Sequence, residues 1–240
     1  MSEARDSAGV PFSGRVLGGT GFDGDDGSPD PALTESLGDP RDEPALMRAV
    51  AGARFLVPIV AEPTEVDSSG DLTVEKQTDM AAVTLVAADG TRALPVFSCA
   101  SALAAWDPAA RPVPVTAARA AQAAVYERCE VMVVDVAGPR TVALRPSMVW
   151  ALAQERDWVP AHLDPTVRRA VEAAARDQDA VIAHELGAGA PGEGVLRVSL
   201  TLRPGLDAAA VQAVATGIGE RLATDGEIRA RIDGLAFAIS

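Results

Sequence analysis

Short runs of branched apolar residues alternate with Ala-rich segments along this chain, and this alternation restricts it to folds that mix strands with helices. Residues 55–60 (FLVPIV) and 131–136 (VMVVDV) are apolar runs of strand length, as expected of buried strands. Before the first run, Leu46 and Val50 recur at helical spacing. We therefore predict an α+β fold with two small mixed α/β modules, each a short sheet packed by helices.

Changes in composition divide the chain into four parts. Residues 1–41 are rich in Gly, Asp, Ser and Pro, which predicts a flexible or loosely docked leader. Residues 42–155 form the first predicted α+β domain and residues 165–240 the second. Residues 156–164 interrupt the periodicity between them, which predicts a linker.

Local signals place individual elements within these parts. Asp30 before Pro31 predicts a short helix inside the leader, because Asp caps helix N-termini and Pro fits the first helical position. Asp89-Gly90 predicts a hairpin between the runs 80–88 and 91–98. Pro95 is then expected at a bulge, or with its missing donor turned away from a partner strand. Further helices are predicted at 117–128, 146–154, 165–176 and 207–223, and further strands at 141–144, 180–185, 195–202 and 235–239.

The charge balance bears on the class of partner. The chain has 21 Lys and Arg against 34 Asp and Glu, a net charge of −13. Such a chain repels phosphate backbones and anionic lipid, which argues against nucleic-acid and membrane partners. No charge-free apolar stretch of about 18 residues is present, which argues against a membrane helix. The N-terminal residues MSEARDSAGV lack the features of a secretory signal, so we expect a cytoplasmic protein.

Two Gly- and Asp-rich motifs are incomplete. The GxGxxG pattern at residues 19–24 has no convincing strand before it, and acids follow where a pyrophosphate would lie. A calcium loop that starts at Asp23 would need an oxygen ligand and a Glu where Gly27 and Thr34 stand. We interpret both patterns as a solvated acidic loop.

The residues that most often carry catalysis are scarce. His162 and His184 are the only histidines, and neither HExxH nor GxSxG occurs. Cys99 and Cys129 stand far apart in the sequence, and we expect both to be small buried hydrophobes. We therefore predict no catalytic residue, no metal site and no cofactor.

A polar cluster just before the predicted hairpin is the best remaining candidate for a site. It contains Asp79 and Lys76, the only lysine of the chain. Trp106 and Arg111 follow in the sequence and would add an aromatic ring and a cation to a ligand- or partner-binding surface. The alternative is that the charged pair forms solvated ion pairs worth about 0–1 kcal/mol and that Trp106 fills a gap between Ala-faced helices.

Several stretches resemble a known family. Residues 75–124, with the motifs ALPVFS and RPVPV, resemble the N-terminal domain of the SseB-type proteins, named for enhanced serine sensitivity, in their actinobacterial form. The segments 24–33 and 45–61 are similar to what precedes that domain, and residues 195–239 resemble the family's C-terminal domain. Ser98-Cys99 stands where a Thr-Ser pair is common, which weakens a hydroxyl-based role there. The resemblance implies no agreed reaction, cofactor or catalytic residue.

Three hypotheses about function follow. The first is a non-catalytic cytoplasmic accessory protein that binds another protein, whose identity is unknown. The second is a small-molecule sensor or an enzyme with a polar cleft near Lys76, Asp79, Trp106 and Arg111. The third is a secretion-associated protein, because the family name is shared with a type III secretion translocon component. The long amphipathic or coiled-coil helices expected of such a component are not evident in the sequence.

Overall fold

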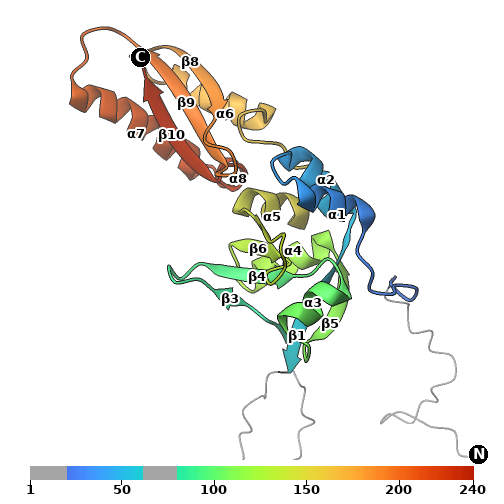
Figure 1. Cartoon of the computed structure of the whole chain (residues 1–240). Helices are drawn as coiled ribbons and strands as arrows, with labels where there is room; N and C mark the ends of the chain where they lie inside the picture. The colour runs from blue at the N-terminus through green and yellow to red at the C-terminus, as the bar shows by residue number, and fades with distance from the viewer. Residues whose placement is uncertain (1–20, 62–79) are drawn as a thin grey trace, which may run out of the picture.

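Acidic and hydroxyl side chains begin most of the helices in the computed structural model, which describes residues 21–61 and 80–240 (Figure 1). Each of these side chains accepts a hydrogen bond from a backbone N–H of the first helical turn, which would otherwise lack a partner. The helices capped in this way are α1 (Pro31–Gly38) by Asp30, α2 (Glu43–Gly52) by Asp42, α4 (Ala117–Tyr126) by Thr116, α6 (Pro165–Arg176) by Asp164, α7 (Ala208–Thr224) by Asp207 and α8 (Gly226–Arg231) by Asp225.

The N-terminal part of the described chain contains two sheets. In the first, β1 (Arg54–Ala61) pairs antiparallel with both β2 (Met80–Ala82) and β5 (Arg111–Thr116). The second has the order β3-β4-β6-β7, and its two central strands are parallel to each other. Its strands are β3 (Leu85–Val86), β4 (Arg92–Val96), β6 (Val131–Val134) and β7 (Val142–Leu144).

A continuous apolar core joins these sheets to the helices. It extends from Leu33 on α1 to Leu152 on α5 (Pro146–Ala153) and includes four fully buried alanines of α4. A smaller cluster around Phe97 packs against α3 (Ala100–Trp106). α4 packs along α5, and its small Ala side chains allow close contact.

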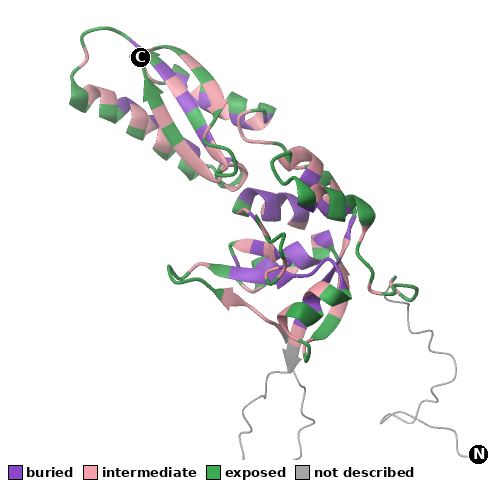
Figure 2. Cartoon of the chain, in the orientation of Figure 1, coloured by how far each residue is buried: buried purple, intermediate pink, exposed green. Residues whose placement is uncertain are grey.

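The C-terminal part forms its own core around a three-stranded sheet. Its order is β10-β9-β8, with β8 (Val181–Ala188) antiparallel and β10 (Gly234–Ile239) parallel to the central β9 (Val195–Leu202). Alternate residues of β9 are buried against α6, α7 and α8. Figure 2 shows this alternation as purple bands along β9. The fold is therefore α+β, as predicted.

The structure differs from the sequence prediction in several places, and β5 and α8 occupy segments for which no strand or helix is predicted. Leu33 and Leu37 of α1 are buried in the first core, so residues 31–38 pack with the domain and are not part of a flexible leader. The run 80–88 does not form one hairpin strand: β2 pairs with β1, and only the two residues of β3 pair with β4. The hairpin predicted at Asp89-Gly90 is therefore confirmed for β3 and β4, whereas residues 80–82 join another sheet, because strand pairing depends on distant residues.

Pro95 lies in β4 without a bulge. The N–H of Asp135 donates to the carbonyl of Val96, so the backbone groups of Val96 face β6. Those of the preceding Pro95 face the other way, at a point before the start of β3. Its missing donor is turned away from its partner strand, which is one of the two positions predicted.

Candidate functional site

Arg145, at the start of α5, connects the two parts of the molecule. Its guanidinium donates to both carboxylate oxygens of Glu43, at 2.5 and 3.1 Å, and its Nε donates to Asp233 Oδ2 at 2.9 Å. Glu43 begins α2 in the first domain, whereas Asp233 precedes β10 in the second. Burial is the largest single effect on the pKa of Arg145 and lowers it, but hydrogen bonds and charge from the two carboxylates raise the pKa above its ordinary value. The ion pairs therefore bind the domains together.

Asp233 also caps α5 from the other domain. Its Oδ1 accepts from the N–H of Ser147 at 2.8 Å and its Oδ2 from the Ser147 hydroxyl at 2.7 Å. The α5 N-cap residue, Arg145, supplies no side-chain acceptor of its own. The indole Nε1 of Trp158 donates to the same hydroxyl at 3.0 Å, so the predicted linker residue is part of this polar junction.

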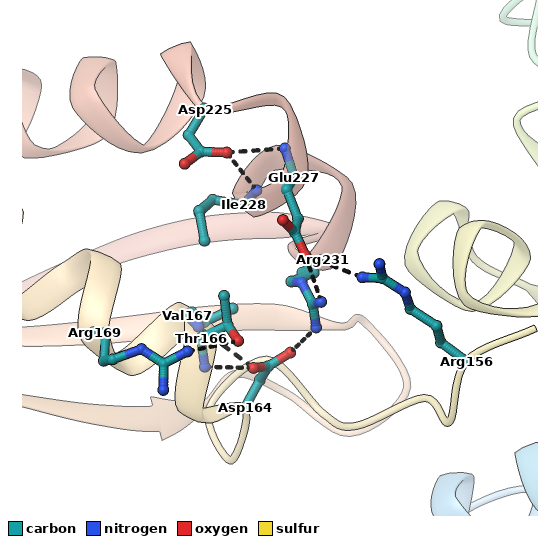
Figure 3. Close-up of polar contacts among 9 residues, drawn as sticks. All are labelled: Arg156, Asp164, Thr166, Val167, Arg169, Asp225, Glu227, Ile228 and Arg231. Carbon is teal, nitrogen blue, oxygen red and sulfur yellow. Dashed lines mark hydrogen bonds and ion pairs between the residues drawn. The ribbon is translucent and has the colours of Figure 1, made fainter. Parts of the chain in front are cut away.

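A second polar network crosses the junction around Arg231 (Figure 3). Arg231 donates to Asp164 at 2.7 Å and to Glu227 at 2.8 Å, and Arg156 donates to the same Glu227 at 3.1 Å. The guanidinium carbons of Arg231 and Arg156 lie 5.0 and 5.5 Å from the ring centroid of Trp150 on α5. Hydrogen bonds from the two arginines lower the pKa of Glu227. These charges are balanced within the network and serve to hold the domains.

A cleft of about 670 Å³ lies between the domains beside these networks. Its polar lining includes Arg41, Arg145 and His162. Its apolar lining includes Leu46 and Met148 from the first domain, and the loop from Ala188 to Val195 closes it from the second. Concave sites at domain interfaces are common places for ligands.

A second cavity, of about 430 Å³, lies at the carboxyl ends of the parallel strands β4 and β6. Asp135 follows β6 with φ of 51°, and its two carboxylate oxygens accept from the backbone and hydroxyl of Ser98 at 2.8 and 2.7 Å. Cys99 lines the cavity, with Sγ 3.2 Å from the Ser101 hydroxyl. No histidine lines this cavity, so the cluster lacks the base of a Cys-His or Ser-His pair.

The two thiols have shifted pKa values in opposite directions. Burial is the largest effect on Cys99 and raises its pKa, but hydrogen bonds from Ser101, the Ala102 backbone and Ser98 bring the pKa below its ordinary value. Burial raises the pKa of Cys129, and Arg92 offsets this only in part. Both cysteines are buried free thiols, in agreement with the prediction of small buried residues.

The family follows from a comparison of the sequence with protein-family models. Residues 30–151, just over half of the chain, match the SseB protein N-terminal domain. The chain belongs to the SseB family. A search of curated proteins and a search of solved structures each found no match. The SseB match includes Glu43, Arg145 and Ser147 and ends before Asp233, so the junction lies partly outside the matched domain.

Of the four residues proposed from sequence, only Trp106 and Arg111 lie in the part of this SseB-family chain that the structure describes. Lys76 and Asp79 lie outside the described residues. Trp106 is half-buried and packs on Phe97, with ring centroids 5.3 Å apart, so it fills a gap in the core. Arg111 is exposed at the start of β5. Neither Trp106 nor Arg111 lines either cavity.

Local hydrogen bonds and an ion pair account for the acidic loop motif. Asp25 pairs with Arg54, and Asp26 accepts from the backbone and hydroxyl of Ser28, which explains the acidic loop without a cation. Within residues 21–61 and 80–240, no group of three or more His, Cys, Asp or Glu is arranged to hold a metal ion. In the same ranges no helix has the length and apolarity needed to cross a membrane.

Sequence reasoning missed Arg145 and Asp233. The available signal was a helix start at Pro146 without a capping side chain before it, which indicates that the cap comes from elsewhere. Because Arg145 and Asp233 are 88 residues apart in the sequence, no local pattern indicates that they pair.

Proposed function

We propose that this protein is a non-catalytic accessory protein of the cytoplasm that binds another protein through an apolar surface made by Val86, Val125 and Tyr126. The observation that carries the proposal is the exposure of these side chains. Tyr126 is 85% exposed, Val86 64% and Val125 57%. We call them the Tyr126 surface.

The topology puts these residues at one end of the four-stranded sheet. Val86 pairs with Arg92, the first residue of β4. The N–H of Glu130 donates to the carbonyl of Arg92, and α4 ends at Tyr126, only four residues before Glu130. The end of α4 and the end of β3 therefore both lie near the start of β6.

The chemistry of this surface suits a protein partner. Tyr is enriched at the energetic centres of protein interfaces, because it buries a large rigid ring and keeps a polar tip. Arg92, Arg128 and Glu130 are exposed around the apolar residues, as in the charged rim of an interface. The mixed charges favour a partner with an apolar centre and a rim of both signs.

The polar clusters support a role without catalysis. Both carboxylate oxygens of Asp233 accept hydrogen bonds from Arg145 and Ser147. Both carboxylate oxygens of Asp135 accept hydrogen bonds from Ser98. Groups that are saturated by structural partners have little capacity left for proton transfer to a substrate.

Affinity capture from the native host at physiological salt tests the proposal. The double variant Val125→Ser, Tyr126→Ser removes the apolar centre, and Ile182→Ser, which is 61% exposed on β8, is the matched control. We expect a stoichiometric partner protein with the wild type and the control, and at least a tenfold loss with the double variant. Equal recovery with both variants, or no stoichiometric partner at all, contradicts the proposal.

The interdomain cleft favours a second candidate function, a small-molecule sensor. Its volume of about 670 Å³ is within the range of ligand pockets. Ala190 is an exposed lining residue and is not a hydrogen-bond partner of Arg145. Ala190→Trp is therefore chosen to occlude the cleft, and the exposed Ala209 of α7 provides the control Ala209→Trp. Dialysis against a fractionated metabolite extract, read by mass spectrometry, should enrich one compound on the wild type and control only. Equal enrichment on Ala190→Trp excludes the cleft.

A further inference from the structure

Most edge strands in the described part carry a feature that prevents pairing with another chain. β2, β3 and β7 are only two or three residues long, and β5 contains two prolines. β8 has an irregular register between Val181 and Ala183 and carries Glu185. Short length, proline, irregularity and charge are the usual ways in which natural proteins protect sheet edges.

β10 has none of these features. Its six residues, GLAFAI, contain neither charge nor proline, and its register with β9 is regular from Gly234 to Ile239. A regular, uncharged edge of this length is a template for another strand.

The outward-facing backbone groups of β10 can be identified from its ladder. The N–H of Ser240 donates to Leu200, and the carbonyl of Ser240 accepts from Leu202. Backbone groups alternate in direction along a strand, so Leu235, Phe237 and Ile239 point their N–H and carbonyl groups away from β9. Among the described residues, none makes a backbone hydrogen bond to these outward groups.

Apolar side chains of the C-terminal core remain partly exposed at this edge. Leu235 and Phe237 pack on the core but stay half-buried, and Ile239 is 44% exposed. Figure 2 shows β10 without the purple bands of β9. A strand added beside β10 would pair the outward backbone groups and cover these side chains together.

We propose that β10 pairs antiparallel with β10 of a second copy of this chain, which joins the two C-terminal sheets into one of six strands. Two-fold symmetry requires the antiparallel direction and closes the assembly at a dimer. The chemistry of the strand itself favours a second copy. β10 of another copy is a regular strand of the same length without charge or proline, so no charge is buried and the two edges present matching outward backbone groups. The same half-covered apolar residues meet on both sides of the axis, so each copy completes the core of the other.

Sedimentation velocity of the full chain over a wide concentration range tests this dimer. Ile239→Lys places a charge on the proposed interface, and Ile182→Lys makes the same change at the opposite edge of the same sheet. We expect the wild type and Ile182→Lys to sediment at twice the chain mass of 24.7 kDa and Ile239→Lys at the single chain mass. A wild type that is monomeric throughout, or an Ile239→Lys variant that remains dimeric, overturns the proposal.

Two further measurements keep the test decisive if the lysine variant fails to fold. Ile239→Pro removes one outward N–H and leaves the ladder with β9 in place, and it should be monomeric. Hydrogen exchange on the wild type should show the amides of Phe237 and Ile239 protected at high concentration and exchanging at least tenfold faster on dilution. Concentration-independent exchange of both amides also overturns the proposal.

Discussion

Asp233 of the C-terminal domain caps helix α5 of the N-terminal domain through the backbone N–H of Ser147, at 2.8 Å. The same carboxylate pairs with Arg145 and accepts from the Ser147 hydroxyl. One residue therefore satisfies a helix N-terminus and a largely buried cation across the domain boundary. Docking of the second domain and completion of α5 are coupled by this contact.

Replacement of Asp233 should weaken the whole junction. Asp233→Ala removes a helix cap worth about 1 kcal/mol and half of the charge compensation of Arg145, so we expect a total loss of about 3 kcal/mol in the free energy of unfolding. Asp177→Ala is the control, because Asp177 and its partner Arg221 are both more than half exposed; it should cost at most about 1 kcal/mol. Urea denaturation measures both, and equal losses would contradict the coupling.

Gly194 is predicted to be intolerant of a side chain. Its φ is 68°, and a Cβ there would overlap the Arg145 guanidinium and lie 2.6 Å from Asp233 Oδ2. Gly192 has φ of 83° with open space around it, so Gly192→Ala introduces only backbone strain, about 1–2 kcal/mol. Gly194→Ala should be the more destabilising of the two, and thermal denaturation compares them. Similar melting temperatures would show that the Arg145 and Asp233 side chains move aside for the added Cβ without a loss of stability.

Loss of the Arg231 guanidinium should open the second network. Arg231→Met leaves the buried Asp164 carboxylate with only its capping N–H donors, and breaking such a pair costs about 3 kcal/mol. Arg176→Met removes an exposed pair on α6, with side chains 71% and 53% exposed, and serves as control. Limited proteolysis within residues 155–164 should accelerate in the first variant alone. Unchanged cleavage rates would show that the Arg145 pairs hold the junction without this network.

Cys99 should react before Cys129. The lowered pKa of Cys99 gives it more thiolate at any mildly alkaline pH than Cys129, whose pKa is raised by burial. As pH rises, alkylation by iodoacetamide should therefore appear first at Cys99, and peptide mass spectrometry can follow both sites. Ser101→Ala removes the largest lowering contribution and should shift the onset at Cys99 to higher pH. The same order of reaction with no shift in this variant would assign the difference to access.

Much of the fold was accessible from sequence because its determinants are local. The helix predicted at 165–176 coincides with α6, since Asp164 and Pro165 define its start within two residues. The run 80–88 was misassigned because its halves belong to different sheets, and strand pairing depends on side chains far away in the chain.

For the candidate site too, the residues proposed from sequence differ from those that the structure brings together. Lys76 and Asp79 lie outside the described residues, and Trp106 is drawn into the Phe97 cluster by its apolar area. Arg145 and Asp233 look like ordinary charged residues in the sequence, and only their meeting gives them a role.

The sequence by itself determined the α+β class, the SseB family membership and the starts of α1, α4, α6 and α7. These depend on short-range patterns of apolar spacing, capping residues and motifs. Only the tertiary structure decided which charges meet at the junction, which strand leaves its edge uncovered and where apolar side chains remain exposed. Those outcomes depend on packing between segments many tens of residues apart, which no local pattern encodes.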